Sequence, residues 1–417
     1  MTTTTSLRLR LAAGLVPLAA LLLGACNLEV TNPGPVNASY LNDKAAFPAL
    51  VNGAGRDVSE ALNWVAYTGA AVARELHPAG STGSFGITPA QQGGKLVDDE
   101  TGTHWQLAQR ARWTSESALT RIKTVLGSSY AANPQYLQAL IWAGYANRLL
   151  GENFCDGVID GGPKESYTVY LTRAEADFTE AITVATSQNN ATLLNAAKAG
   201  RASVRLLRKD LTGAAADASG LANTFVYKMP YNTLDADQYN RIYWSTANAP
   251  YRAHTVWNTF YEAYYTSTKD PRTPWGSDPK NPVGDAAVGN LGKVPWYFEL
   301  KHSAKDSPIN LNTGWEMRLI EAEAKLTAGD VPGAMTLVNM HRVALNLAPW
   351  TPANATEAWT ALKRERGIEL WLEGRRLGDY RRWAANGTPG TADDMTGRDL
   401  CFATPREEKE SNPNFKP

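Results

Sequence analysis

Two short segments of one pattern, each placed directly after an apolar helical stretch, most constrain the fold of this chain. The pattern Asp-x-x-Gly-Ala occurs at 210–214 and again at 330–334. An Asp at this point accepts hydrogen bonds from the free amide groups that begin a helix, and so predicts a helix start. Gly329 is expected to end the preceding helix, because glycine readily adopts the left-handed conformation found there. Each segment therefore predicts a helix, a tight turn and a second helix, with Ala214 and Ala334 allowing the two helices to approach closely.

Helical periodicity extends over most of the chain. Apolar residues recur at three- and four-residue spacing, which indicates amphipathic helices, in the segments 45–54, 58–76, 105–126, 136–150, 172–187, 193–208 and 315–326. Helix, tight turn and helix with small residues at the contact is similar to a tetratricopeptide unit. The segments 136–150 and 172–187 are a further candidate pair. Helical hairpins of a general kind are the alternative.

Two segments interrupt the helical pattern. Residues 77–100 are rich in Gly, Ser, Pro and Gln and predict a loop long enough to have a function. Residues 229–311 are rich in Pro, Gly, Asn and aromatic side chains, and predict a loop-rich lobe with one helix over 251–267 and one strand over 292–301. The sequence thus predicts a mainly α protein in which the inserted lobe contains little β-structure.

The first 25 residues have the parts of an export signal. Arg8 and Arg10 precede an apolar run over 11–25, which is shorter than the ~20 apolar residues of a membrane span. The residues Leu23-Gly24-Ala25-Cys26 resemble a bacterial lipoprotein box, which implies cleavage before Cys26 and attachment of lipid, including palmitate, to that cysteine. An ordinary secretory signal with an incidental cysteine is the alternative. Residues 26–43 are rich in Asn and Pro and predict a tether.

Charge and cysteine content limit the partners and the redox environment that can be expected for the protein. The chain has 41 basic and 41 acidic residues, and without a basic excess nucleic acid is not expected as a partner. Once Cys26 has received lipid, Cys155 and Cys401 are the remaining cysteines. Because an exported compartment permits disulfides, these two are a candidate pair, and two unpaired thiols are the alternative.

The C-terminal region carries the most specific motif. Residues 365–383 have the sequence Glu-Arg-Gly-Ile-Glu-Leu-Trp-Leu-Glu-Gly-Arg-Arg-Leu-Gly-Asp-Tyr-Arg-Arg-Trp, which resembles the signature of the SusD/RagB family of nutrient-uptake lipoproteins. Further matches follow the family's order at 28–33, 321–324, 329–330, 339–342 and 404–414. The resemblance is strong at both ends of the chain and weak over 229–311. Thr404-Pro405 stands where the family usually has Ile-Pro.

The resemblance implies a SusD-like domain over 44–417. Tetratricopeptide-like helix pairs over 44–228 and 312–417 would carry a binding lobe over 229–311. It also implies lipid anchoring in the outer membrane facing the cell exterior, and a TonB-dependent, SusC-like transporter as partner. Such a protein captures oligosaccharide for import and does no chemistry on it, and we expect no cofactor and no metal. Three alternatives are capture of peptide, a tetratricopeptide-type envelope scaffold without ligand, and a glycoside hydrolase.

Aromatic side chains in irregular segments are the main candidates for sugar contacts, because a flat apolar ring can stack on a sugar. These candidates are Tyr243, Trp244, Tyr264, Trp275 and Trp296. The family's use of its early loop adds His77 and Phe85. Aromatic residues on periodic helices are expected to pack in the interior instead, and they are Trp64, Tyr67, Trp113, Trp142 and Trp315.

Acidic residues of the signature offer a second candidate site. Glu365, Glu369 and Glu373 are four residues apart, which places three carboxylates on one helical face. Two carboxylates can hydrolyse a glycosidic bond, but an ion-pair network that braces the last helices is favoured here. The expected partners are the nearby Arg366, Arg375, Arg376, Arg381 and Arg382.

Metal-binding patterns are weak. The five histidines lack the spacing of His-Glu-x-x-His. The segment 235–240 begins like a calcium loop but lacks the central glycine and the terminal acidic ligand.

Overall fold

The computed structural model describes residues 40–247 and 249–415. The predicted signal peptide, Cys26 and most of the tether over 26–43 lie outside the described residues. The chain divides into the units 1–41 and 42–417, and the second is described below. In the part of the chain that the structure covers, no helix has both the length and the apolar character to cross a membrane.

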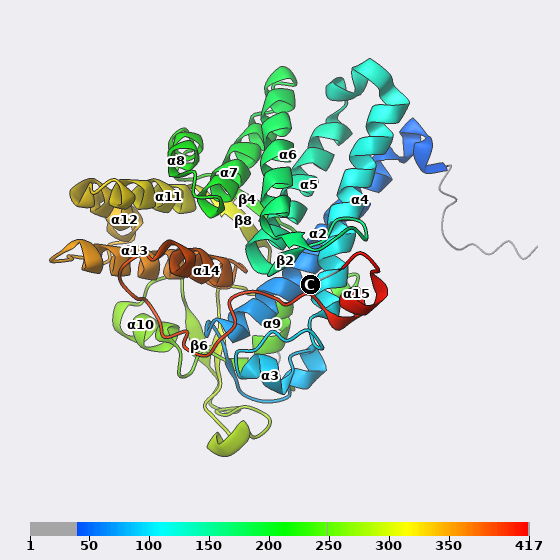
Figure 1. Cartoon of the computed structure of the whole chain (residues 1–417). Coiled ribbons are helices and arrows are strands. Elements are labelled where there is room, and N and C mark those ends of the chain that lie inside the picture. Colours follow the sequence, from blue (N-terminus) through cyan, green and yellow to red (C-terminus); the bar gives the residue numbers. More distant parts are fainter. Residues whose placement is uncertain (1–39, 248, 416–417) are drawn as a thin grey trace, which may run out of the picture. The chain divides into compact units, whose positions relative to one another are not determined.

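Antiparallel helices that follow one another in sequence make up the first half of the scaffold (Figure 1). Each packs against the next, in the order α2 (Phe47–Val72), α4 (Gly102–Leu126), α5 (Pro134–Asn153), α6 (Thr168–Ser187), α7 (Ala191–Leu207) and α8 (Leu211–Ser219). The short α3 (Pro89–Gln92) lies between the first two. The predicted mainly α fold class is confirmed.

The scaffold resumes after the loop-rich segment. Helix α11 (Gly314–Thr327) packs against α8 and α7, so the helical stack continues although the chain has left it. It also contacts α12 (Val331–Ala344) and α13 (Ala355–Glu369). The last helices are α14 (Arg376–Asn386), which contacts α5 and α2, and α15 (Arg406–Ser411).

The two Asp-x-x-Gly-Ala segments cap helices as the sequence predicts. The side chain of Asp210 accepts a 2.9 Å hydrogen bond from the amide of Gly213, and that of Asp330 accepts one of the same length from the amide of Gly333. A Cβ on either of these glycines would collide with the carboxylate of its capping residue. The glycine in the pattern therefore makes room for the cap. Gly329 ends α11 with a φ of +83°, as expected.

Some element boundaries differ from those expected. Helix α2 runs unbroken where the sequence suggested separate helices over 45–54 and 58–76. Its Gly55 lies against α5, where an added Cβ would be 2.9 Å from Nε1 of Trp142, so this glycine allows close packing without breaking the helix. The helix expected over 251–267 is limited to α10 (Phe260–Thr268). The strand expected over 292–301 is limited to β7 (Tyr297–Glu299).

Four pairs of short antiparallel strands occur in the described residues, and three of them join segments of the chain that are 19 or more residues apart. Strand β4 (Val226–Met229) pairs with β8 (Ile309–Thr313), which brings the two ends of the loop-rich segment together. Strand β6 (Trp275–Ser277) pairs with β7, and β1 (His77–Pro78) pairs with β5 (His254–Thr255). The remaining pair is β2 (Asp156–Gly157) with β3 (Glu165–Ser166). Between β4 and β5 lies the short helix α9 (Arg241–Thr246).

The C-terminal segment is attached to the end of α5. Cys155 and Cys401 form a disulfide with an S–S distance of 2.04 Å. Beside it, the amide of Cys155 donates a 3.0 Å hydrogen bond to the carbonyl of Phe402, whose side chain is fully buried. The disulfide and the buried ring both hold this segment on the scaffold.

The burial expected for Trp113 is wrong. Its side chain is 55% exposed, whereas the preceding Arg112 is 2% exposed and occupies the buried stripe of α4. The stripe passes through Trp105, Ala108, Arg112 and Ser115 at three- and four-residue spacing, and Trp113 lies one position outside it. The other aromatic residues expected in the interior are buried or half-buried, and they are Trp64, Tyr67, Trp142 and Trp315.

Candidate functional site

The acidic residues of the C-terminal signature do not form one helical face. Helix α13 carries Glu365 and ends at Glu369. Glu373 follows Leu372, whose φ of +62° turns the chain out of the helix. The prediction that three carboxylates share one helical face is therefore wrong. Only Glu365 and Glu369 lie on the same helix.

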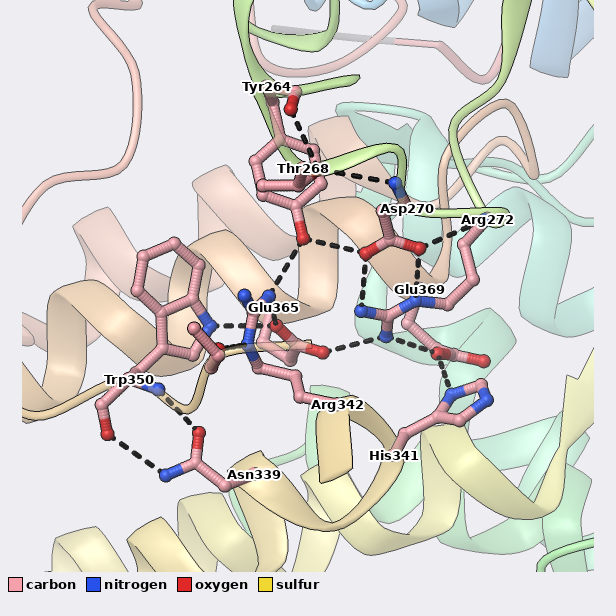
Figure 2. Close-up of polar contacts among 11 residues, drawn as sticks. Tyr264, Thr268, Asp270, Arg272, Asn339, His341, Arg342, Trp350, Glu365 and Glu369 are labelled. Atoms are coloured by element: carbon pink, nitrogen blue, oxygen red, sulfur yellow. Dashed lines mark hydrogen bonds and ion pairs between the residues drawn. The ribbon is translucent and has the colours of Figure 1, made fainter. Parts of the chain in front are cut away.

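The ion-pair network expected around these carboxylates is present, but its partners are not the expected ones (Figure 2). Arg272, which follows α10, donates hydrogen bonds of 2.7 Å to Glu365 and 2.9 Å to Glu369. Arg342 of α12 donates to Glu365 at 3.1 Å. His341 places Nδ1 2.7 Å from Glu369. The cations thus come from α12 and from the loop-rich segment.

The arginines of the signature bind other groups. Arg366 donates hydrogen bonds of 2.9 and 3.0 Å to Asp379, and Arg375 donates one of 2.7 Å to Glu152 of α5. Further partners are Asp393 for Arg376, Glu323 for Arg382, and the carbonyls of Gly151, Glu152 and Phe154 for Arg381. These bonds connect α13 and α14 with α5 and α11, which explains the charged signature by its structural role.

The electrostatics of the network do not suit acid–base catalysis. Burial acts to raise the pKa of Glu369, but the hydrogen bond from His341 and the charge of Arg272 outweigh it and keep the pKa below its usual value. A glycosidase acid needs the opposite, a raised pKa and a proton to give. Because both carboxylates are also hydrogen-bonded in the interior, they do not present a surface to a substrate.

Three of the seven candidate ligand-binding side chains lie in the interior. Phe85, Tyr264 and Trp296 are 3%, 7% and 2% exposed. The hydroxyl of Tyr264 donates to Asp270 at 2.6 Å and accepts from Arg342 at 2.7 Å, which joins it to the ion-pair network (Figure 2). Burial favours packing over ligand contact for these three side chains.

Three other candidates are half-buried, and none of them lines the pocket of His77 that is described below. Trp275 stacks on Tyr297 with ring centroids 4.5 Å apart. The ammonium group of Lys305 lies 4.1 Å from the ring centroid of Trp244. Tyr243 is the residue before Trp244 on α9. A ligand contact by Tyr243, Trp244 or Trp275 stays a prediction.

His77 is the candidate that lines a large open pocket, with a volume of about 600 Å³. The walls come from the end of α2, from β1, from α3, from the residues before α10 and from the turn 288–291. Arg398 of the C-terminal segment completes it. The polar side chains that line it are Arg74, His77, Gln92, Asn258, Thr259, Asn290 and Arg398.

The orientation of His77 is fixed by its neighbours. Its Nδ1 lies 2.8 Å from the carbonyl oxygen of Pro78, so Nδ1 carries the proton and Nε2 is left as an acceptor. The ring packs edge-on against Trp257, with centroids 5.2 Å apart. Burial lowers the pKa of His77, and the charges of Arg74 and Arg398 lower it further. A neutral His77 can therefore accept a hydrogen bond from a ligand hydroxyl.

Two crossing loops support this pocket. The carboxylate of Asp285 accepts a 2.7 Å hydrogen bond from the amide of Ser81 and a second hydrogen bond from its hydroxyl. A Cβ on Gly284 would collide with the carbonyl of Ala79. The loops approach closely because this glycine has no side chain, and the crossing ties the segment after β1 to the turn 288–291.

Sequence reasoning identified the region of the pocket but missed most of its lining. The length of the loop over 77–100 indicated a function there, and His77 and Gln92 belong to it. Arg74 adjoins this segment, but Asn258 and Arg398 are far from it in sequence, and the sequence carries no signal that places them together. Among residues 40–247 and 249–415, no group of three or more His, Cys, Asp and Glu side chains is arranged to hold a metal ion.

Comparison with known proteins gives one family. Residues 227–416 match the model of the SusD family. A SusD-like carbohydrate-binding protein from Bacteroides vulgatus is 16% identical, with a TM-score of 0.64 and coverage of 89% of this chain and 97% of that chain. A SusD superfamily protein from Bacteroides thetaiotaomicron is 11% identical, with a TM-score of 0.65 and coverage of 90% and 98%.

A laminarin-binding SusD-like protein is 17% identical to this chain, with a TM-score of 0.60, and the match covers 89% of this chain and all of that one. None of the curated proteins matches the sequence. At these identities the solved structures establish a shared fold that extends beyond the segment matched by the family model.

Proposed function

Since this chain belongs to the SusD/RagB family, we propose that it is a lipid-anchored binding protein of the outer membrane, facing the cell exterior. It captures oligosaccharide and passes it, chemically unchanged, to a TonB-dependent transporter. Cys26 carries the lipid, and residues 26–43 are the tether.

The observation that carries this proposal is the pocket beside His77. It is open and large enough for several sugar units, and it combines amide side chains with an imidazole acceptor. Gln92, Asn258 and Asn290 can donate to and accept from sugar hydroxyls. The exposed Leu291 and Pro89 offer apolar contacts to the C–H faces of a sugar ring. A concave pocket in which placed polar groups stand among apolar ones is typical of small-molecule sites.

Binding is tested by calorimetry with a panel of oligosaccharides and residues 44–417, which are called the soluble domain below. His77→Ala is expected to weaken binding of the best ligand by about tenfold, the effect of losing one well-placed hydrogen bond and a ring contact. Trp244→Ala and Trp275→Ala test the two aromatic groups outside this pocket. Loss of binding in those two variants, with His77→Ala unchanged, would place the ligand elsewhere. Absence of binding to every oligosaccharide would contradict the proposed function.

Anchoring and partnership need the full chain. Metabolic labelling with a palmitate analogue is expected to label the full-length protein, and Cys26→Ala is expected to abolish the label. A tagged full-length protein, solubilised from outer membranes, is expected to co-purify with a TonB-dependent transporter. Retention of the label in Cys26→Ala, or purification without a transporter, would each contradict one part of the proposal.

A further inference from the structure

The pocket beside His77 has an unusual charge pattern. Two guanidinium groups line it, those of Arg74 and Arg398, and none of the described lining residues is acidic. Arg74 follows the end of α2, and Arg398 comes from the segment that the disulfide attaches to the scaffold. A concave surface lined by one sign of charge focuses its field and attracts ligands of the other sign.

The two guanidinium groups have donors to spare. Arg398 uses one N–H in a 2.7 Å hydrogen bond to the carbonyl of Val72, in the last turn of α2, which leaves its other N–H groups available. Across the described residues, the structure gives the side chain of Arg74 no hydrogen bond and no ion pair. Half-buried cations usually have a partner, because taking a charge out of water is costly.

The surroundings do not neutralise this charge. Burial lowers the pKa of Arg398, and the charge of Arg74 lowers it further, so the two guanidinium groups repel each other. The carboxylate that interacts with both belongs to Asp394. It is exposed, does not line the pocket, and accepts a 2.9 Å hydrogen bond from the amide of Thr396. An anion in the pocket would relieve the repulsion.

We propose that the ligand of this pocket is an acidic oligosaccharide, whose carboxylate or sulfate accepts hydrogen bonds from Arg74 and Arg398. Neighbouring hydroxyl groups bind His77 and the amides of Asn258 and Asn290. This inference rests on the proposed function and specifies its substrate class. Guanidinium groups suit both anions, because their planar donors match two oxygens at once.

The strand next to the pocket argues against an extended peptide as the ligand. A peptide commonly binds by adding a strand to a free sheet edge. Strand β1 has two residues, one of them Pro78, which has no N–H to donate, and it is already paired with β5. The pocket therefore offers side chains rather than a backbone edge, which suits a ring with many hydroxyl groups.

Arg74 allows a clean test because of its backbone. Its φ is +60°, in the left-handed region that Asn tolerates, so Arg74→Asn removes the charge without forcing a change of conformation. Lys209 has a φ of +68° just after α7, is exposed, and does not line the pocket. Lys209→Asn is thus a matched control that removes one positive charge at a similar helix end.

The probes are a galacturonate tetrasaccharide, its carboxyl-reduced neutral counterpart, a sulfated galactose tetrasaccharide and a tetra-aspartate peptide, measured by calorimetry with the soluble domain. We expect at least one acidic sugar to bind about tenfold tighter than the neutral one. Arg74→Asn is expected to remove that preference, and Lys209→Asn to retain it. Which acidic sugar binds distinguishes a carboxylate from a sulfate ligand. Added salt should weaken only the acidic sugar.

Arg398→Gln is a second, independent test, and it is also expected to reduce the preference for acidic over neutral sugar. Circular dichroism checks that this variant folds. Equal binding of neutral and acidic sugars, unchanged in Arg74→Asn, would overturn the acidic specificity and leave the proposed function standing. Tighter binding of the peptide than of any sugar would overturn the sugar class. Failure of every sugar to bind would contradict the proposed function itself, and this inference with it.

Discussion

Arg272, from the loop that follows α10, donates a 2.9 Å hydrogen bond to Glu369, the last residue of α13. Because these residues are 97 positions apart in sequence, the bond fastens the loop-rich segment to the C-terminal helices. The same guanidinium binds Asp270 and Glu365, so three buried or nearly buried carboxylates share one cation.

Removing that cation should strongly destabilise the protein. Arg272→Met keeps much of the side-chain volume but leaves the three carboxylates without their shared partner. Breaking a buried ion pair in this way typically costs about 3–5 kcal/mol, and we expect a loss of that size in the free energy of unfolding, measured with urea. The control is Lys95→Ala, which breaks an exposed pair with Asp399 and should change stability little. Similar effects of the two variants would contradict the role assigned to Arg272.

Glu75 should make stability depend on pH. It is 1% exposed and accepts a 3.2 Å hydrogen bond from the amide of Leu372. Burial raises its pKa to about 7 from 4.5, although nearby Arg376 and Lys301 act to lower it and Glu373 to raise it. The folded state therefore binds the proton more tightly than the unfolded state, and its stabilising contribution is lost as the pH rises from about 4.5 to 7.

Glu75→Gln is neutral at every pH and should remove this loss. Relative to the natural protein, the variant is expected to gain up to about 3 kcal/mol at pH 8 and to gain much less at pH 5. Urea unfolding at the two pH values measures the difference. A gain or a loss that does not vary with pH would show that the carboxyl group of Glu75 is not the titrating group.

The disulfide between Cys155 and Cys401 closes a loop of 246 residues. Closing a long loop restricts the unfolded chain, and removal of such a bond typically costs about 2–5 kcal/mol. The double variant Cys155→Ser/Cys401→Ser of the soluble domain should lose stability in that range. Dithiothreitol should lower the stability of the natural domain to a similar level and leave the double variant unchanged. A natural domain that is insensitive to the reductant would contradict this expectation.

The loop crossing beside the pocket should matter for binding. Gly284→Ala would place a methyl group against the carbonyl of Ala79 and push apart the loops that Asp285 and Ser81 connect. We expect weaker binding of the best oligosaccharide by about tenfold or more, since small displacements of a site are costly. Gly83→Ala, at a glycine of the same region with open space around its Cβ position, should retain affinity in the same titration. Equal affinity in both variants would contradict a supporting role for the crossing.

Local features of the fold could be predicted from the sequence, and distant pairings could not. The caps at Asp210 and Asp330 depend on residues three positions apart, so a short motif is sufficient to predict them. The partners of Glu365 and Glu369 depend on how α12 and the loop after α10 are placed in space. Nearby arginines in the sequence therefore suggested the right kind of interaction but the wrong residues.

In the candidate site, too, contacts between residues distant in sequence could not be predicted. Aromatic residues in irregular segments were expected to be open to a ligand, yet Tyr264 and Trp296 are buried, because the loop-rich segment packs extensively against the rest of the chain. Trp113 shows the opposite error, because it was expected to be buried and is exposed. A shift of one position on a helix is enough to turn a side chain from the core to the solvent. Arg398 lies in the same pocket as His77 because the C-terminal segment returns to the end of α2. No sequence motif predicts the course of that segment.

The antiparallel pairing of β4 with β8 has a consequence for how this protein can diversify. Met229 lies opposite Ile309, and α8 packs directly against α11, so the helical stack is continuous whatever lies between the two strands. The entropic cost of closing a longer loop rises slowly with its length. The exposed loops between Met229 and Ile309 can therefore lengthen or change without interrupting the stack, as long as the buried contacts of this segment, such as that of Arg272 with Glu369, are kept.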